Sequence, residues 1–308
     1  MDLHNLASDY PNAAFSYRAF LDFNPLSGER KTRRLAIPNN EMRALHHQII
    51  RHFRNLRAVH WAAKGGVPET SSMKAIEPHR RHRYIYHLDL KGAYNQVKVK
   101  TLAQILCGID GNLGSQEEVE AFLTRFCFTD QQRLATGGSA SVDLFNIALR
   151  PIDEKIAHLA REFGLAYTRY MDDLILSADR PIGHRLRRRI RAIVIEQGYT
   201  INHRKSHVWD LTKGPIVVLG VGIEFKGRLF VPRRYIRHVK GLLHWARGQK
   251  RPLALAARIA GKMGTVLAVT KRNTKNQTEG NLLNEHFAWQ TRLRLLRPER
   301  RRKAVGRS

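Results

Sequence analysis

The sequence predicts an α+β fold, in which helices and antiparallel strands form one body and further helices follow it. Apolar and aromatic residues alternate over 83–90 (RYIYHLDL), which is the two-residue period of a strand. Over 165–178 (LAYTRYMDDLILSA), two such strands flank a tight turn. Over 40–53 and 183–197, apolar residues recur at three- and four-residue spacing instead, which indicates amphipathic helices.

The N-terminal region predicts little regular structure before the first helix. Residues 1–40 are polar and turn-rich except for a short strand at 34–37, which Pro38 ends. Asn39 or Asn40 caps the helix that follows.

The middle of the chain predicts three further helices. Residues 60–80 contain glycines and a proline, and predict a loop that leads into a short helix. Ser115, followed by glutamates, starts a helix that ends near Phe126. Glycines at 137–138 form a turn before a long helix over 142–163.

The last part of the chain changes character after Pro232. Before it, 217–223 and 228–231 predict a hairpin. After it, 233–248 and 253–269 are helical with basic faces. This shift predicts two domains, at 1–231 and 232–308.

Charge is the strongest signal in the composition. Lys and Arg number 54 against 26 Asp and Glu, which gives a formal net charge of +28. A surface this positive repels itself unless a polyanion neutralises it. The basic residues run through the whole chain, which favours nucleic acid as the partner over a generally basic protein of the ribosomal kind. Hydrophobic residues make up 43%, which is too many for a disordered chain.

The cysteines and the apolar segments indicate the cellular compartment of the protein. Cys107 and Cys127 have no second pair beside them, which predicts buried thiols and neither a disulfide framework nor a zinc site. The first residues lack a signal-peptide pattern, and no stretch approaches the roughly 18 apolar residues of a membrane span. We therefore expect a soluble, cytoplasmic protein without a membrane partner.

Three carboxylates stand at the ends of predicted strands. Asp172 and Asp173 are adjacent in the hairpin turn, and Asp89 closes the strand at 83–90. Adjacent like charges cost stability unless a cation neutralises them. A lysine could do so, and turns favour Asp, but three oxygen ligands at strand ends suit Mg²⁺. Two such ions about 4 Å apart promote nucleotidyl transfer. The P-loop, HExxH and GxSxG motifs of competing chemistries are absent from the sequence.

Two motifs at these acids resemble those of reverse transcriptases. Residues 170–173 (YMDD) resemble the YxDD motif, and residues 89–94 (DLKGAY) resemble the first palm motif, Asp-x-x-x-x-Tyr/Phe. Over roughly 17–270, further resemblances follow in family order: a fingers segment at 33–38, a glycine-containing segment at 64–79, a fourth motif at 198–205, a primer-grip hairpin at 218–220 and a thumb after 232. The resemblance implies a right-hand polymerase fold with fingers, an antiparallel-sheet palm and a small helical thumb.

The resemblance implies a metal site at the three acids. Asp89, Asp172 and Asp173 would be catalytic and would hold two Mg²⁺ ions, or Mn²⁺ in their place. The Leu90 carbonyl would be an additional ligand.

The resemblance also implies nucleotide and nucleic-acid contacts. Tyr94 would lie under the incoming sugar and exclude a 2′-hydroxyl, although a core aromatic is the default at such a junction. Arg33, beside Lys31 and Arg34, would clamp the triphosphate unless it belongs to a solvated loop. Lys205 would protonate the pyrophosphate or simply bind phosphate. The residues expected to track phosphates are Arg233, Arg234, Arg237, Lys240, Arg247, Lys250 and Arg251.

One family motif differs in this chain. Relatives carry Leu-Pro-Gln-Gly-x-Pro-x-Ser-Pro-x-Leu-x-Asn, whereas residues 134–146 read LATGGSASVDLFN. The three prolines and the glutamine are lost. In the family the glutamine touches template and nucleotide. The resemblance therefore implies that Thr136 and Gly137 bind the nucleotide, and the change to Thr136 puts ordinary template handling in doubt.

The resemblance implies an RNA-directed DNA polymerase that makes cDNA from dNTPs. With its divergent motif and without nuclease, integrase or RNase H regions, the chain resembles bacterial retron or anti-phage defence enzymes. Such enzymes work with a dedicated structured non-coding RNA. The expected partners are that RNA, an RNA template, a DNA product, and either a second copy of the chain or an accessory effector protein. Two alternatives stay open: template-independent dNTP addition by the same site, and a non-catalytic RNA-binding scaffold.

Overall fold

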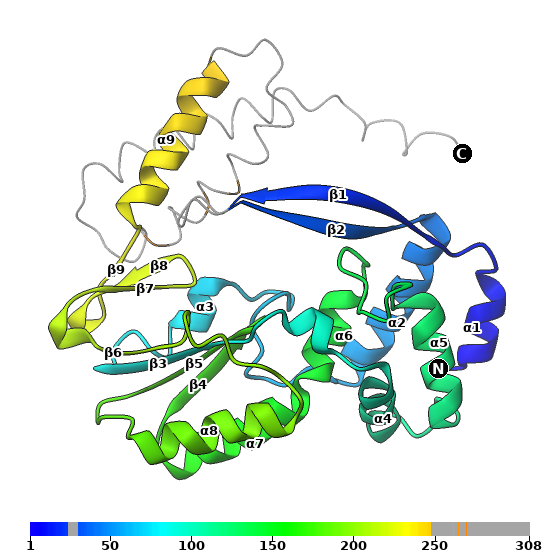
Figure 1. The fold of residues 1–308 in the computed structure, drawn as a ribbon, viewed down its shortest axis with the longest axis horizontal. Helices are drawn as coiled ribbons and strands as arrows, with labels where there is room; N and C mark the ends of the chain where they lie inside the picture. Colours follow the sequence, from blue (N-terminus) through cyan, green and yellow to red (C-terminus); the bar gives the residue numbers. More distant parts are fainter. Residues whose placement is uncertain (24–29, 248–260, 262–263, 265–268, 270–308) are drawn as a thin grey trace, which may run out of the picture.

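A four-stranded antiparallel sheet carries the predicted acids. The computed structural model describes residues 1–23, 30–247, 261, 264 and 269. Its central sheet has the order β4-β5-β3-β6 (Figure 1). These strands are β3 (Tyr84–Asp89), β4 (Ala166–Tyr170), β5 (Asp173–Ala178) and β6 (His207–Asp210). The predicted strand and hairpin are therefore confirmed, and β6 was not predicted.

Helices cover both faces of this sheet. On one face α7 (Arg150–Glu162) packs against β4 and against α8 (His184–Glu196), and on the other α3 (Ser72–Ile76) packs against β4 (Figure 1). Because both faces are covered, β5 is buried at every position from Leu174 to Ala178. This explains its nearly continuous apolar run.

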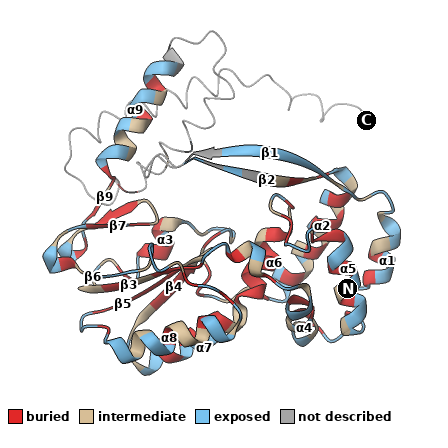
Figure 2. Ribbon diagram, viewed as in Figure 1, coloured by how far each residue is buried: buried red, intermediate tan, exposed pale blue. Residues whose placement is uncertain are grey.

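A group of helices adjoins the sheet and shares its core. The group contains α1 (Leu3–Asp9), α2 (Asn40–Asn55), α4 (Val99–Ile109), α5 (Gln116–Phe126) and α6 (Ser141–Ala148). Asn39 caps α2, and Ser115 with Glu118 forms a capping box on α5, so both predicted starts are confirmed. The helices α1 and α4 were not predicted. Their buried residues join those of the sheet in one apolar cluster (Figure 2).

A long two-stranded ribbon projects from this group. Strand β1 (Phe15–Phe23) pairs with β2 (Arg30–Pro38) over nine residues each, whereas only 34–37 was predicted as a strand. The ribbon is largely exposed (Figure 2), with Phe20 at 51% and Leu21 at 60% exposure. The sequence of β1, FSYRAFLDF, has an apolar residue at every second position from Phe15 to Phe23, so a strand signal was present there and was missed. The sequence of β2, RKTRRLAIP, has no such alternation.

The predicted helix over 142–163 is wrong as a single element. The structure has two helices there, α6 and α7, which meet at Leu149. Pro151 lies in the first turn of α7 and has no N–H to donate to the preceding turn. The proline therefore starts a new helix.

The predicted hairpin near the C-terminal end is a three-stranded sheet. Strands β7 (Ile216–Val218), β8 (Val221–Ile223) and β9 (Leu229–Phe230) pair in that order. The stretch 217–223 is not one strand, because Leu219 and Gly220 have φ of 50° and 78° and turn the chain.

The described helix after Pro232 is α9 (Arg233–Arg247), which confirms the helical prediction for this segment. Its Val239 and Leu243 join β7–β9 in a second apolar cluster. Nearly all of the predicted helix at 253–269 lies outside the described residues, and the domain boundary between residues 231 and 232 stays a prediction. Three 3₁₀ helices complete the description: Ala93–Gln96, Leu211–Lys213 and Phe225–Gly227. None of the described helices combines the length and the apolar character of a membrane span.

Candidate active site

Strand pairing brings the three acids to one end of the central sheet. Asp89, the last residue of β3, lies opposite Asp173, the first residue of β5. Met171 and Asp172 form the turn between β4 and β5, and Met171 has a φ of 56°. The Leu90 N–H donates to the Asp172 carbonyl at 2.9 Å, which fastens the turn to the end of β3.

Burial and neighbouring carboxylates raise the pKa of Asp89 and of Asp172. Burial, with the charges of Asp173 and Asp89 adding to it, raises the pKa of Asp172 to about 6. Burial also raises the pKa of Asp89, against the opposing effect of the nearby Lys205 ammonium. A cation between the carboxylates would relieve both the burial cost and the repulsion.

His87 holds the third acid and was missed by the sequence analysis. Its Nε2 lies 2.6 Å from Asp173 Oδ1, and its ring stacks on Trp209 with centroids 6.0 Å apart. Residues two apart on a strand lie on the same face. The position of His87 two residues before Asp89 was therefore a signal that could have found it.

The acids match the donor chemistry of a Mg²⁺ site in part. Within the described residues, no three His, Cys, Asp or Glu side chains are grouped closely enough to hold a metal ion. Mg²⁺ commonly binds through one or two carboxylates, with waters and substrate phosphates as its other ligands. The electrostatically coupled pair Asp89 and Asp172 meets that requirement, whereas Asp173 is engaged by His87.

A cleft of about 730 Å³ opens beside Asp172. Three other predicted nucleotide-site residues, Tyr94, Thr136 and Gly137, also line it. Tyr94 stacks on Phe145 with ring centroids 4.3 Å apart and an interplanar angle of 12°. Burial, with the Asp172 carboxylate adding to it, raises the pKa of the Tyr94 hydroxyl, which keeps it neutral. Tyr94 thus packs on the core and faces the cleft at once.

Gly137 is required where the ribbon meets this cleft. The Ala36 N–H of β2 donates to the Thr136 carbonyl at 2.8 Å. Gly137 has a φ of 107°, and a Cβ there would lie 2.8 Å from the Ala36 carbonyl oxygen. A larger residue would push β2 away from the cleft.

The predicted basic residues near the nucleotide lie in different places. Arg34 lines the cleft, packs over the Tyr17 ring at 4.0 Å and pairs with Asp130 at 3.4 Å. Arg33 lies in β2 opposite Phe20, and its side chain is outside what the structure describes. Lys205 is not among the cleft residues; its Nζ lies 3.7 Å from Asp89 Oδ2.

The predicted phosphate-tracking residues are described only in part. Arg233, Arg234, Arg237 and Lys240 are exposed along α9. The side chain of Arg247, and Lys250 and Arg251 altogether, fall outside the described residues.

Comparisons with known proteins agree with this geometry. Residues 25–223 match the family model described as reverse transcriptase (RNA-dependent DNA polymerase). The retron Mx65 reverse transcriptase of Myxococcus xanthus is 28% identical over 195 residues, which cover 57% of this chain and 44% of that protein. The retron Ec86 reverse transcriptase of Escherichia coli is 26% identical, with 63% and 59% covered. The chain thus spans about half the length of these relatives.

The fold also resembles a solved structure. Telomerase from Candida albicans, determined with a fragment of telomeric RNA, superposes with a TM-score of 0.50 at 10% identity, covering 94% of this chain and 67% of that one. At that identity the likeness shows the fold alone, which is the α+β polymerase fold that the sequence predicted. Together with the family match over residues 25–223, it confirms the resemblance: the chain belongs to the reverse transcriptase family.

Proposed function

We propose that this protein is an RNA-directed DNA polymerase that extends a primer with dNTPs by two-metal nucleotidyl transfer. The observation that carries the proposal is the position of Asp172. This residue belongs both to the carboxylate cluster with Asp89 and to the cleft with Tyr94. A triphosphate in that cleft would lie next to acids that need a cation.

The chain's own residues have distinct roles in this proposal. Asp89, Asp172 and Asp173, with the Leu90 carbonyl, would hold two Mg²⁺ ions or Mn²⁺. The ions supply Lewis-acid activation of the 3′-hydroxyl and charge compensation for the leaving pyrophosphate. Lys205, placed beside Asp89, would donate a proton or bind phosphate on the pyrophosphate side.

The cleft residues would position the nucleotide. The Tyr94 ring, fixed by Phe145, would lie under the sugar and exclude a 2′-hydroxyl. Thr136 and Gly137 would contact the base pair or its template strand. Arg34 lines the cleft, so it joins Arg33 as a candidate for the triphosphate clamp.

The proposed partner is a structured RNA. The net charge of +28 calls for a long polyanion, and the exposed basic residues of α9 supply contacts for its phosphates. We extend to this chain the retron character of its relatives, with a dedicated non-coding RNA and a role in anti-phage defence. Purification from the native host at about 0.5 M salt, where charge screening is severe, should recover one dominant RNA. Heterogeneous RNA that is lost at this salt would contradict a dedicated partner.

Template-independent synthesis is the second candidate, and Thr136 favours it. This residue lies in the cleft where most relatives have the template-contacting glutamine. The deciding experiment incubates the purified protein with Mg²⁺, dNTPs and a primed RNA of known sequence, and sequences the product. A complementary product supports templated synthesis, and a product unrelated to the template supports the second candidate. RNA binding without any DNA product would leave a scaffold and overturn both.

A further inference from the structure

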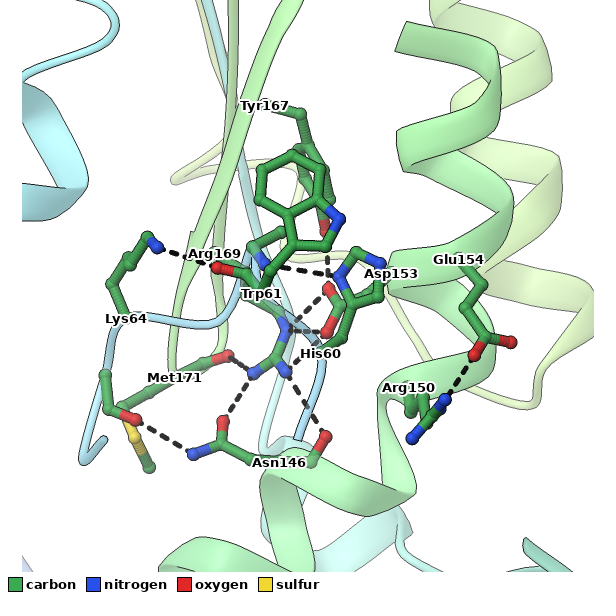
Figure 3. A network of polar contacts seen from close by, with 12 residues as sticks. His60, Trp61, Lys64, Asn146, Arg150, Asp153, Glu154, Tyr167, Arg169 and Met171 are labelled. Carbon is green, nitrogen blue, oxygen red and sulfur yellow. Dashed lines mark hydrogen bonds and ion pairs between the residues drawn. The ribbon is translucent and has the colours of Figure 1, made fainter. Parts of the chain in front are cut away.

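A buried ion pair lies behind the turn that carries Asp172. Arg169 of β4 and Asp153 of α7 both have 0% side-chain exposure (Figure 3). The Arg169 Nε donates to Asp153 Oδ1 at 2.9 Å, and its Nη2 donates to Asp153 Oδ2 at 2.7 Å. The Tyr167 hydroxyl donates to Asp153 Oδ1 at 2.7 Å. The two charges are therefore neutralised by each other and by hydrogen bonds.

The remaining donors of Arg169 reach the turn and α6. Nη1 donates to the Met171 carbonyl at 2.9 Å and to Asn146 Oδ1 at 2.9 Å. Nη2 also donates to the Asn146 carbonyl at 3.3 Å. A guanidinium has five N–H groups in one plane, and here each has an acceptor. Arg169 therefore has one orientation, set by three segments of the chain.

The other side of the turn is closed by backbone. Asn146 Nδ2 donates to the Gly65 carbonyl at 2.9 Å. A Cβ at Gly65 would lie 2.4 Å from the Met171 nitrogen, so only glycine allows this approach. Met171 adopts a left-handed φ of 56° between these contacts, a conformation that L-residues rarely adopt without support.

These contacts lead directly to the acids. Arg169 holds the Met171 carbonyl, and the next carbonyl, that of Asp172, accepts from the Leu90 N–H beside Asp89. Buried ion pairs often contribute little net stability compared with apolar residues of similar volume. Stability alone is therefore a weak explanation for a buried ion pair at this position.

We infer that Arg169, held by Asp153 and Asn146, is a positioning residue that fixes the Met171–Asp172 turn and thereby the spacing between the Asp172 and Asp89 carboxylates. This inference rests on the proposed function, because it assigns the network to the same site. It predicts that loosening the network impairs metal binding and the chemical step more than dNTP binding.

The test uses the full 308-residue chain with Arg169→Lys and Asn146→Ala. Lysine keeps a charge for Asp153 but cannot donate to Asp153, Asn146 and Met171 together. Alanine keeps the ion pair and removes one acceptor of Arg169. We expect kcat per folded molecule to fall at least tenfold in each, with the KM for dNTP changed less than threefold. We expect Mn²⁺ affinity, measured by electron paramagnetic resonance without dNTP, to fall about fivefold.

Tyr167→Phe is the matched control. It removes a hydrogen bond to the same Asp153 from the same strand but leaves every contact of Arg169 with the turn. Its kcat and Mn²⁺ affinity should stay within twofold of wild type, whatever its melting temperature. If Asn146→Ala and Arg169→Lys behave like Tyr167→Phe, the positioning role is overturned.

The two proposals fail in different ways. A wild-type protein that binds Mn²⁺ but incorporates no dNTP would refute the polymerase proposal, while the Mn²⁺ comparison would still decide the role of Arg169. If Arg169→Lys does not fold, Asn146→Ala decides it alone. A wild-type protein that binds no Mn²⁺ overturns both.

Discussion

Behind the Met171–Asp172 turn, Arg169 and Asp153 are fully buried, and the guanidinium donates three hydrogen bonds to the carboxylate. In front of it, Asp89 is buried and Asp172 is half-buried, and Asp89 forms a described ion pair with the Lys205 ammonium, whose Nζ lies 3.7 Å from Oδ2. The charges behind the turn neutralise each other without a ligand. Under the proposed function, the front needs an added cation to balance its carboxylates, which would separate structural charge from functional charge within one hairpin.

The largest expected effect is loss of activity at the front. Asp172→Asn removes a carboxylate that would hold metal, and metal stabilisation of transition-state charge is worth several kcal/mol. We expect dNTP incorporation to fall about a thousandfold or more, while RNA binding stays within twofold. Primer extension and filter binding measure the two. Asp9→Asn, at the exposed end of α1, is the control and should be fully active. Primer extension by Asp172→Asn near the wild-type rate would refute the metal assignment.

An aspartate-to-asparagine substitution behind the turn should reduce stability. Asp153→Asn leaves the Arg169 charge buried without its partner, and such a change costs about 3–5 kcal/mol. Asp172→Asn should instead leave the metal-free protein as stable as wild type or more so, because it removes a repelled charge. Urea unfolding with a chelator present measures both. Equal destabilisation by the two substitutions would abolish the distinction between back and front.

The front should also make stability depend on pH. The pKa of Asp172 is about 6 in the fold against 3.8 as the ordinary value, so the folded state binds the proton more tightly. Stability from this group is therefore fully present below about pH 3.8 and is lost as pH rises through about 6, by at most about 3 kcal/mol. Chelator-treated wild type should show this loss relative to Asp172→Asn, and millimolar Mg²⁺ should reduce it. Parallel pH profiles of the two proteins would contradict the raised pKa.

The sequence predicted the front better than the back because the two leave different signals. Asp89 and Asp172 end alternating apolar segments, where a carboxylate has no structural reason to lie. Arg169 lies inside β4 between Thr168 and Tyr170, where the alternation hides it. Its partner Asp153 lies in the helix α7, and no local sequence spacing relates the two residues. A charged residue inside a predicted strand was the available hint.

The β1–β2 ribbon was missed although part of its signal is in the sequence. Apolar residues stand at every second position of β1, whereas β2 begins with a polar, basic run that has no alternation, so the nine-residue pairing was not recognised. Arg33 was chosen for the triphosphate from its place in a motif. Its side chain lies outside what the structure describes, so this choice stays a prediction, and its neighbour Arg34 lines the described cleft.

The smallest expected effect concerns sugar choice, and it compares a tyrosine on each side of the turn. Tyr94 lines the cleft in front, and Tyr167 is bonded to Asp153 behind. Tyr94→Ala opens space beneath the sugar, and we expect the ratio of kcat/KM for rNTP to that for dNTP to rise about tenfold, which corresponds to about 1.4 kcal/mol. Tyr167→Phe should leave the ratio unchanged. Because Tyr94 also stacks on Phe145, Tyr94→Ala will lose some stability, and the ratio must be measured below its melting temperature. A general loss of activity with an unchanged ratio would make Tyr94 a core residue, and sugar exclusion would then have to come from another residue of the cleft.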